Sequence, residues 1–241
     1  MIVQYKLILH TGSQNFRQEW AYPLYSALMN DTEPEFAENV HEQSDRITPL
    51  SQYLRRTNEG ILWTVSLFGE NSITALAPLL DSRTEFILCN EKIPLYVSKR
   101  EFIQLNGADD LLASAKASEG SDRCLRFRTP AAFKSKGQYI NFPTVRLILQ
   151  NLIRKWNACM DGFRFGDTEA DVLSEGLLCR QFNIQDRRYF VKGNPIPGYV
   201  GEMIFQNIFD GEEHDRADAL LSFAGYAGVG IKTALGMGGV E

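Results

Sequence analysis

The last 17 residues of the chain combine many glycines with apolar side chains, and this combination limits how the chain can fold. The segment from Gly225 to Glu241 holds six glycines, which can adopt positive φ and allow another part of the chain to approach closely. The apolar residues between them favour burial: Val229, Ile231, Leu235, Met237 and Val240. We therefore expect a packed glycine-rich loop that ends in a short strand at 239–241, rather than a flexible tail.

This loop also has features of a phosphate-binding segment. Backbone N–H groups beside Lys232 and Thr233 would suit phosphate oxygens if they are exposed. The segment does not match the P-loop, because the glycine spacing before Lys232 differs. It does not match the dinucleotide fingerprint either, which must open a strand–helix–strand unit.

The first half of the chain alternates between strand-like and helix-like patterns. Branched and aromatic residues predict strands, and apolar residues at helical spacing predict helices. The expected elements are a strand at 2–10, short helices at 22–29 and 34–41, a strand at 61–68, a helix at 71–80 capped by Asn71, and one or two strands within 85–102. This order is the ferredoxin-like pattern, an antiparallel sheet backed by helices.

The second half repeats this order after a small, polar connector at 106–122, in which 109–117 could form a short helix. Thr144 is placed to cap an amphipathic helix at 145–158. Strands are expected from 124, at 187–191 and at 199–205, with a further helix at 212–224. The sequence therefore predicts an α+β protein of two tandem ferredoxin-like domains, at 1–110 and 120–241.

The net charge of −5 is distributed unevenly. Residues 121–194 contain 13 Lys and Arg against 7 Asp and Glu, whereas the parts before and after them are acidic. Eight basic residues and no acidic residue lie between 123 and 160: Arg123, Arg126, Arg128, Lys134, Lys136, Arg146, Arg154 and Lys155. Such a stretch indicates a polyanionic partner, since released counterions drive phosphate binding. A solvated basic face is the alternative.

Histidine is rare, and one of the three histidines lies in a suggestive place. His41 ends the second predicted helix, with Tyr25 on the preceding helix and Arg46 five residues later. If the two helices pack antiparallel, Tyr25 and His41 could face one cleft. A histidine with a pKa near ~6.5 can move a proton at neutral pH. A structural role is the default for His10 and His214, and a core role is the alternative for Tyr25.

The glycine spacing resembles that of a known family. Gly228, Gly230, Gly236 and Gly238 form two G-x-G pairs separated by five residues, with Lys232 between them. This pattern resembles the C-terminal glycine-rich loop of the RAMP superfamily of CRISPR-associated RNA-binding proteins, in particular the repeat-RNA processing endoribonucleases (the Cas-six family). Two other phrases are similar to family patterns, R-T-P-A-A-F at 128–133 and P-G-Y-V-G-E-M-I-F at 197–205.

The resemblance implies a set of catalytic residues. In this family a tyrosine on the first helix, a histidine ending the next short helix and a basic residue just beyond form the usual active site. These positions correspond to Tyr25, His41 and Arg46. The chain departs from the family pattern in having arginine where lysine is usual, and in lacking the aromatic residue before Thr48.

The resemblance also implies an activity. The fold would be of the RRM/RAMP-like kind, and the protein would cut CRISPR repeat RNA within precursor transcripts to give guide RNAs for antiviral defence. The RNA 2′-hydroxyl would attack, without a metal or other cofactor, and leave 2′,3′-cyclic phosphate and 5′-hydroxyl ends. The alternatives are a non-catalytic RAMP subunit that binds guide RNA beside other Cas effector subunits, and a ferredoxin-like protein that binds a small molecule or a protein.

RNA contacts are expected from the second half of the chain: Arg126, Arg128, Lys134, Lys136, Gly228, Gly230, Lys232, Gly236 and Gly238. Four cysteines without a C-x-x-C pair give no zinc or redox motif. No run approaches 18 apolar residues, and the first residues lack the pattern of a signal peptide. We therefore expect a cytoplasmic protein without membrane association.

Overall fold

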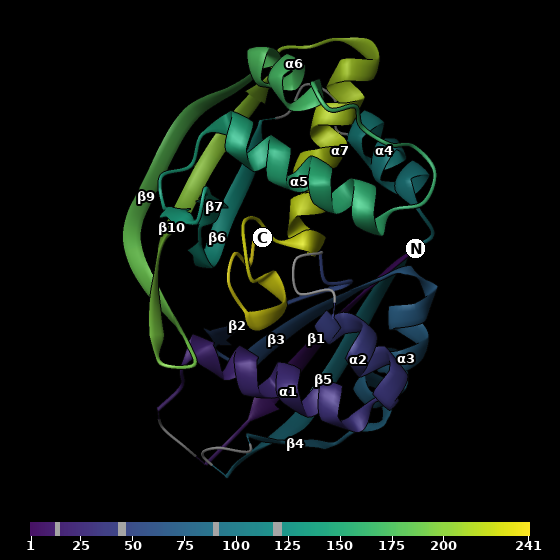
Figure 1. Ribbon diagram of the computed structural model, residues 1–241, viewed down its shortest axis with the longest axis vertical. Coiled ribbons are helices and arrows are strands. Elements are labelled where there is room, and N and C mark those ends of the chain that lie inside the picture. The colour runs from purple at the N-terminus through teal and green to yellow at the C-terminus, as the bar shows by residue number, and fades with distance from the viewer. Residues whose placement is uncertain (13–14, 43–46, 89–91, 118–121) are drawn as a thin grey trace.

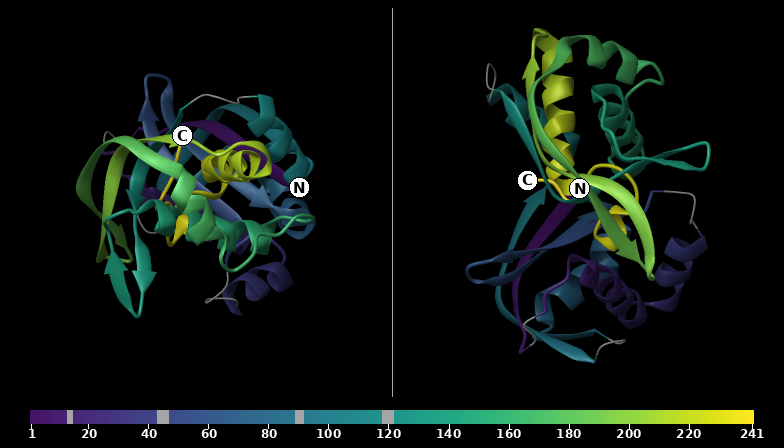
Figure 2. Two further views of the ribbon diagram at one scale, coloured as in Figure 1. Left: turned by 90° about the horizontal axis from the view of Figure 1, so that it is seen from above. Right: turned by 90° about the vertical axis from the view of Figure 1, so that its left-hand side faces the viewer.

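The computed structural model describes residues 1–12, 15–42, 47–88, 92–117 and 122–241, and for His41 and Glu42 it describes the backbone alone. The chain forms two lobes, with the first half below and the second half above in Figure 1. The glycine-rich segment lies between the lobes, and both termini lie near this waist (Figure 2). None of the helices in the described part of the chain is long and apolar enough to cross a membrane.

The lower lobe contains a five-stranded antiparallel sheet of order β2-β3-β1-β5-β4. Its strands are β1 (Ile2–His10), β2 (Leu50–Thr57), β3 (Gly60–Phe68), β4 (Glu85–Leu88) and β5 (Ile93–Leu105). The helices α1 (Ala21–Asp31), preceded by the 3-10 turn η1 (Gln18–Trp20), α2 (Pro34–Glu42) and α3 (Gly69–Ser82) cover one face. Alternate residues of β1 and β3 pack into the core beneath these helices, because successive strand side chains point to opposite faces.

The upper lobe contains a three-stranded sheet of order β6-β10-β9, built from β6 (Arg123–Ala131), β9 (Leu177–Val191) and β10 (Asn194–Asn207). Val240 forms an antiparallel bridge with Phe127 of β6 and so occupies the place of a fourth strand. The helices α4 (Ala108–Ala117), α5 (Val145–Cys159) and α7 (Gly211–Ala227) share the second apolar core. The remaining elements are α6 (Glu169–Gly176), the 3-10 turn η2 (Thr233–Leu235) and a small hairpin of β7 (Phe133–Ser135) and β8 (Gln138–Ile140).

Both lobes have the ferredoxin-like strand order, in which the first strand lies between the third and the last. The predicted fold class, an α+β protein of two tandem ferredoxin-like units, is therefore confirmed. The predicted capping of α5 is also confirmed, because the Thr144 hydroxyl accepts a hydrogen bond of 3.2 Å from the Leu147 N–H. The domain limits at 110 and 120 stay a prediction.

Several local expectations are wrong. Asn71 does not cap α3, which begins two residues earlier at Gly69. The strand β9 begins at Leu177 rather than at 187. The short helix considered within the connector is present as α4, but its residues Leu111 and Ala115 are buried in the core shared with α7, so this stretch packs as part of the upper lobe. The strand β2, the helix α6 and the β7–β8 hairpin were not expected from the sequence.

Candidate functional site

The glycine-rich segment connects the two lobes. Ala234 is buried in the core of the lower lobe, whereas Val229 and Val240 are buried in the core of the upper lobe. The side chain of Gln52 on β2 donates hydrogen bonds to the carbonyl oxygens of Ala21 (2.7 Å) and Ala234 (2.8 Å). The segment is thus held by both lobes, as its apolar residues lead us to expect.

Most backbone N–H groups of this segment have acceptors within the protein. Between residues 229 and 239, eight of them donate hydrogen bonds inside the chain: those of Val229, Gly230, Ile231, Leu235, Gly236, Met237, Gly238 and Gly239. The N–H groups of Lys232, Thr233 and Ala234 are not among these eight, so phosphate binding at this short stretch stays a prediction. RNA contacts of Gly228, Gly230, Gly236 and Gly238 stay a prediction, together with those of Lys232, whose side chain is exposed.

Close packing explains why two of these positions are glycine. Gly236 has a φ of 100°, and a Cβ there would meet the Tyr189 hydroxyl of the upper lobe and the Ala21 side chain of the lower lobe. Gly238 has a φ of 64°, and a Cβ there would meet the carbonyl oxygen of Val229. Any larger residue would therefore push the segment away from its neighbours.

A buried lysine anchors the start of this segment. The Nζ of Lys155 donates hydrogen bonds to the carbonyl oxygens of Ala227 (3.0 Å) and Gly228 (2.9 Å) and to the Thr233 hydroxyl (3.3 Å). The first two carbonyls lie at the C-terminal end of α7, where a cation is favoured. Sequence reasoning counted Lys155 as part of a basic surface, although it lies seven residues after Ile148 and three after Leu152, on the apolar stripe of α5, and this spacing was the signal of its burial.

The predicted catalytic residues lie on or beyond two neighbouring helices. Tyr25 is half-buried on α1, and His41 lies in the last turn of α2, a helix that packs beside α1. Arg46 lies outside the described residues. Burial raises the pKa of Tyr25, with a smaller contribution from Tyr22, so its hydroxyl is protonated at neutral pH. The two helices are in contact, as expected, and a shared cleft for Tyr25 and His41 and their catalytic roles stay a prediction.

Arg126 and Arg128, predicted to contact RNA, form ion pairs within the chain. The Nε of Arg126 lies 2.8 Å from Glu202 on the adjacent strand, and the Nε of Arg128 lies 2.7 Å from Glu241. Glu241 also accepts from Arg55 of β2 at 2.6 Å. Burial opposes ionisation of Glu241, but these two arginines outweigh it and lower the carboxyl pKa.

The basic stretch is therefore less positive than its composition indicates. Arg123 and Arg146 also pair with carboxylates from outside the stretch, those of Asp218 and Asp171. Lys134 and Lys136 are exposed on the β7–β8 hairpin, with the Lys134 ammonium 6.0 Å from the centre of the Tyr139 ring. Unlike Arg126 and Arg128, these two lysines have no carboxylate partner within 4.0 Å among the described residues.

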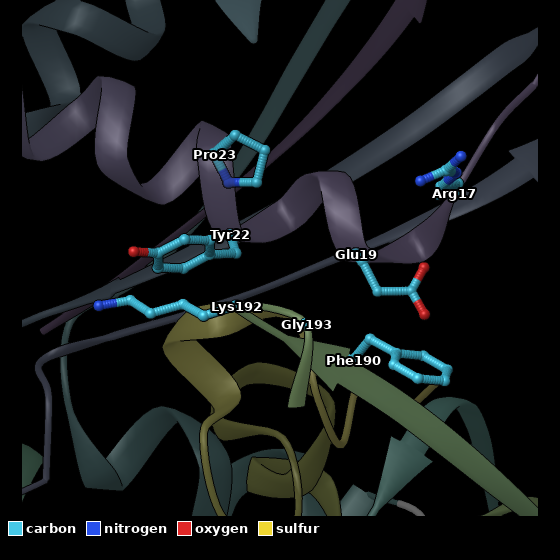
Figure 3. A pocket seen from close by; sticks show the side chains of 7 residues that line it. All are labelled: Arg17, Glu19, Tyr22, Pro23, Phe190, Lys192 and Gly193. Carbon is cyan, nitrogen blue, oxygen red and sulfur yellow. The ribbon is translucent and has the colours of Figure 1, made fainter. Parts of the chain in front are cut away.

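A cleft that sequence reasoning missed lies where the tip of the β9–β10 hairpin meets the start of α1 (Figure 3). It has a volume of about 640 Å³ and is lined by Arg17, Glu19, Tyr22, Pro23, Phe190, Lys192 and Gly193. Its residues come from two parts of the chain, 17–23 and 190–193, so only the folded structure brings them together. Among the described residues, no group of three or more His, Cys, Asp or Glu side chains is placed to hold a metal ion.

Comparison with known proteins gives one consistent family. Residues 125–240 match the family model described as CRISPR-associated endoribonuclease Cas6. A curated Cas6 endoribonuclease of Streptococcus thermophilus is 29% identical over 228 residues, which cover 93% of this chain and 91% of the relative. One of Mycobacterium tuberculosis is 26% identical over 225 residues, covering 90% and 70%. The structure of a Cas6 product complex has a TM-score of 0.77 at 22% identity and matches 100% and 99% of the two chains, which shows a common fold.

Proposed function

We propose that this chain, which matches the Cas6 family model over residues 125–240 and a Cas6 endoribonuclease over 93% of its length, cuts CRISPR repeat RNA within precursor transcripts to release guide RNAs. The observation that carries this proposal is the extent of the relationship, which spans 93% of this chain and 91% of the Streptococcus thermophilus endoribonuclease. It includes both ferredoxin-like lobes and the glycine-rich segment between them. The chain therefore spans nearly the whole length of the Streptococcus thermophilus endoribonuclease.

The proposed chemistry needs no metal. The 2′-hydroxyl of the RNA attacks the adjacent phosphate, so the protein supplies proton transfer and charge stabilisation, and the products carry 2′,3′-cyclic phosphate and 5′-hydroxyl ends. His41 serves as general acid or base. Tyr25, protonated at neutral pH, takes the complementary role as a hydrogen-bond donor on the neighbouring helix. Arg46 stabilises the negative charge of the phosphorane.

RNA recognition is assigned mainly to the upper lobe. The exposed Lys134 and Lys136 on the β7–β8 hairpin contact phosphates, as does the exposed Lys232 within the glycine-rich segment. Arg126 and Arg128 contribute to RNA binding when phosphates replace their carboxylate partners, Glu202 and Glu241. Because A-form RNA hides its major groove, phosphates, shape and unpaired bases carry the recognition.

The test is incubation of the purified protein with its cognate repeat RNA in EDTA. We expect one cut with cyclic phosphate and 5′-hydroxyl ends, and a rate loss of about 10²–10⁴-fold in His41→Ala with RNA binding retained. His10→Ala is the matched control, because His10 is an exposed histidine at the end of β1. RNA with a 2′-deoxy nucleotide at the cut should bind and stay intact.

The other outcomes assign a different role. Tight binding without a cut by the wild-type protein would favour a non-catalytic subunit of an effector complex. Cutting that needs added metal would exclude the proposed mechanism. Cutting that persists in His41→Ala would keep the activity and reject His41 as its proton-transfer group.

A further inference from the structure

The cleft between α1 and the β9–β10 hairpin is built from both lobes. Arg17 and Glu19 come from the segment before α1, Tyr22 from α1 itself, and Phe190 and Lys192 from the hairpin (Figure 3). Its volume of about 640 Å³ is in the range of pockets that hold small organic ligands. A ligand here would touch the lower and the upper lobe at once.

The hairpin wall of the cleft has a defined geometry. Lys192 and Gly193 form a two-residue turn with φ values of 51° and 76°, and positive φ at both central positions is the type I′ geometry favoured in tight hairpins. The hydroxyl of the buried Tyr189 lies 3.0 Å from the carbonyl oxygens of Gln18 and Leu235. These contacts fix the hairpin tip against the start of α1 and the glycine-rich segment.

The side chains that line the cleft suit a nucleotide. Phe190 lines the cleft and is 46% exposed, and an exposed aromatic ring can stack on a base. Arg17 and Lys192 provide two cations for phosphates against the single carboxylate of Glu19. The Lys192 ammonium lies 5.5 Å from the centre of the Tyr22 ring, which holds it at one side of the cleft (Figure 3).

A second hollow continues the same chemistry. It is lined by Asn15, Phe16, Arg17 and Arg56, and so shares Arg17 with the cleft. The Arg56 guanidinium lies 5.8 Å from the centre of the Phe16 ring. Alternation of basic and aromatic side chains along adjoining hollows is the arrangement by which proteins bind single-stranded nucleic acid.

The cleft also adjoins the candidate catalytic site. Tyr22 lies three residues before Tyr25 on α1, so the two side chains share one face of the helix, about one turn apart. The effect of Tyr22 on the pKa of Tyr25 reflects this proximity. A nucleotide in the cleft would therefore lie close to a phosphate held at Tyr25.

We propose that this cleft binds one unpaired nucleotide of the substrate RNA beside the cleavage position, with its base stacked on Phe190 and its phosphates paired with Arg17 and Lys192. The assignment rests on the proposed function, because it takes repeat RNA as the ligand. It adds Arg17 to the RNA contacts of the first half of the chain, which the sequence-based hypothesis limited to the catalytic residues, and it adds Phe190 and Lys192 to those of the second half.

The test couples one protein change with one RNA change. Repeat RNAs that carry a single abasic nucleotide, placed in turn along the sequence and with a 2′-deoxy nucleotide at the cut, are titrated against the protein in EDTA. For the wild-type protein, an abasic nucleotide at one position next to the cut should weaken binding roughly 5- to 150-fold, which is the range of a single base–aromatic stack. The Phe190→Ala variant should bind the intact RNA more weakly by a similar factor. The abasic nucleotide at that position should then cause no further loss of affinity.

The control is Phe142→Ala, which removes another exposed phenylalanine (64%) outside the cleft and should leave the wild-type profile unchanged. Independent, additive effects of Phe190→Ala and every abasic position would overturn the nucleotide assignment while leaving cleavage by the wild type intact. If Phe190→Ala and one abasic position are coupled but the wild-type protein does not cleave unmodified repeat RNA, the nucleotide assignment is kept and the proposed activity is rejected. Failure of repeat RNA to bind at all would reject both.

Discussion

At the scale of single residues, the buried Lys155 is the unusual group of this molecule. Three acceptors surround its Nζ, which matches the three N–H bonds of an ammonium, but among the described residues no carboxylate pairs with it. Burial lowers its pKa from 10.5 to about 7, although the neighbouring Cys159 opposes the shift. In the unfolded chain this lysine regains its ordinary pKa.

A pH dependence of stability follows from this shift. Between about pH 7 and pH 10.5 the unfolded state binds more protons at Lys155 than the folded state, so the contribution of Lys155 to stability rises with pH in this window and is lost as pH falls through 7. The free energy of unfolding of the wild type minus that of Lys155→Met should therefore rise with pH, by up to about 1.4 kcal/mol per pH unit.

Urea denaturation of both proteins at pH 6.5 to 9.5 measures this difference. Lys134→Met is the matched control, since it makes the same substitution at a lysine that is exposed on the β7–β8 hairpin. A flat difference for Lys155→Met would show that the buried ammonium keeps its ordinary pKa.

At the scale of elements, amphipathic elements could be predicted from the sequence and exposed ones could not. The helix α5 has an apolar stripe and a capping threonine, and its predicted start is confirmed. The first part of β9 could not be recognised, because it is an edge strand whose residues from Arg180 to Arg188 are mostly exposed and show no alternation. The cleft at Phe190 and Lys192 was missed for the same reason, since its position depends on where β9 places the tip of the β9–β10 hairpin.

The contribution of a helix cap can be isolated by comparing two threonines. Thr144 precedes α5 and its hydroxyl accepts from the Leu147 N–H, whereas Thr168 precedes α6 without a side-chain capping bond. Thr144→Ala should therefore lower the free energy of unfolding by about 0.5–2 kcal/mol. Thr168→Ala should change it by much less, and equal losses in the two variants, measured by urea denaturation, would contradict this account of the α5 start.

At the scale of the whole molecule, the last residues of the chain join the two lobes. Glu241 pairs with Arg55 of β2 and Arg128 of β6, and the Gly225 carbonyl accepts from Gln4 of β1 at 2.9 Å. The glycine-rich segment lies between these contacts and touches both cores. The relative position of α1, the β9–β10 hairpin and the proposed active site therefore depends on how closely this segment packs.

Gly236→Ala tests that dependence directly. The new methyl would meet the Tyr189 hydroxyl and Ala21, one from each lobe, at a φ of 100° that disfavours alanine. We expect a loss of more than about 2 kcal/mol in the free energy of unfolding, because backbone strain and overpacking add together. Gly225→Ala is the control, since its methyl would meet nothing within 4 Å in the helix α7, where alanine is favoured by about 0.5–1 kcal/mol.

Both variants are compared with the wild type by denaturation and by their affinity for repeat RNA in EDTA. A separated pair of lobes should widen the cleft at Phe190, so Gly236→Ala should also lose the coupling between Phe190 and the abasic position, whereas Gly225→Ala should keep it. If Gly236→Ala remained as stable as Gly225→Ala, the close contact of the two lobes at this glycine would be excluded. The glycine-rich segment would then have to act on RNA by itself rather than by holding the lobes in place.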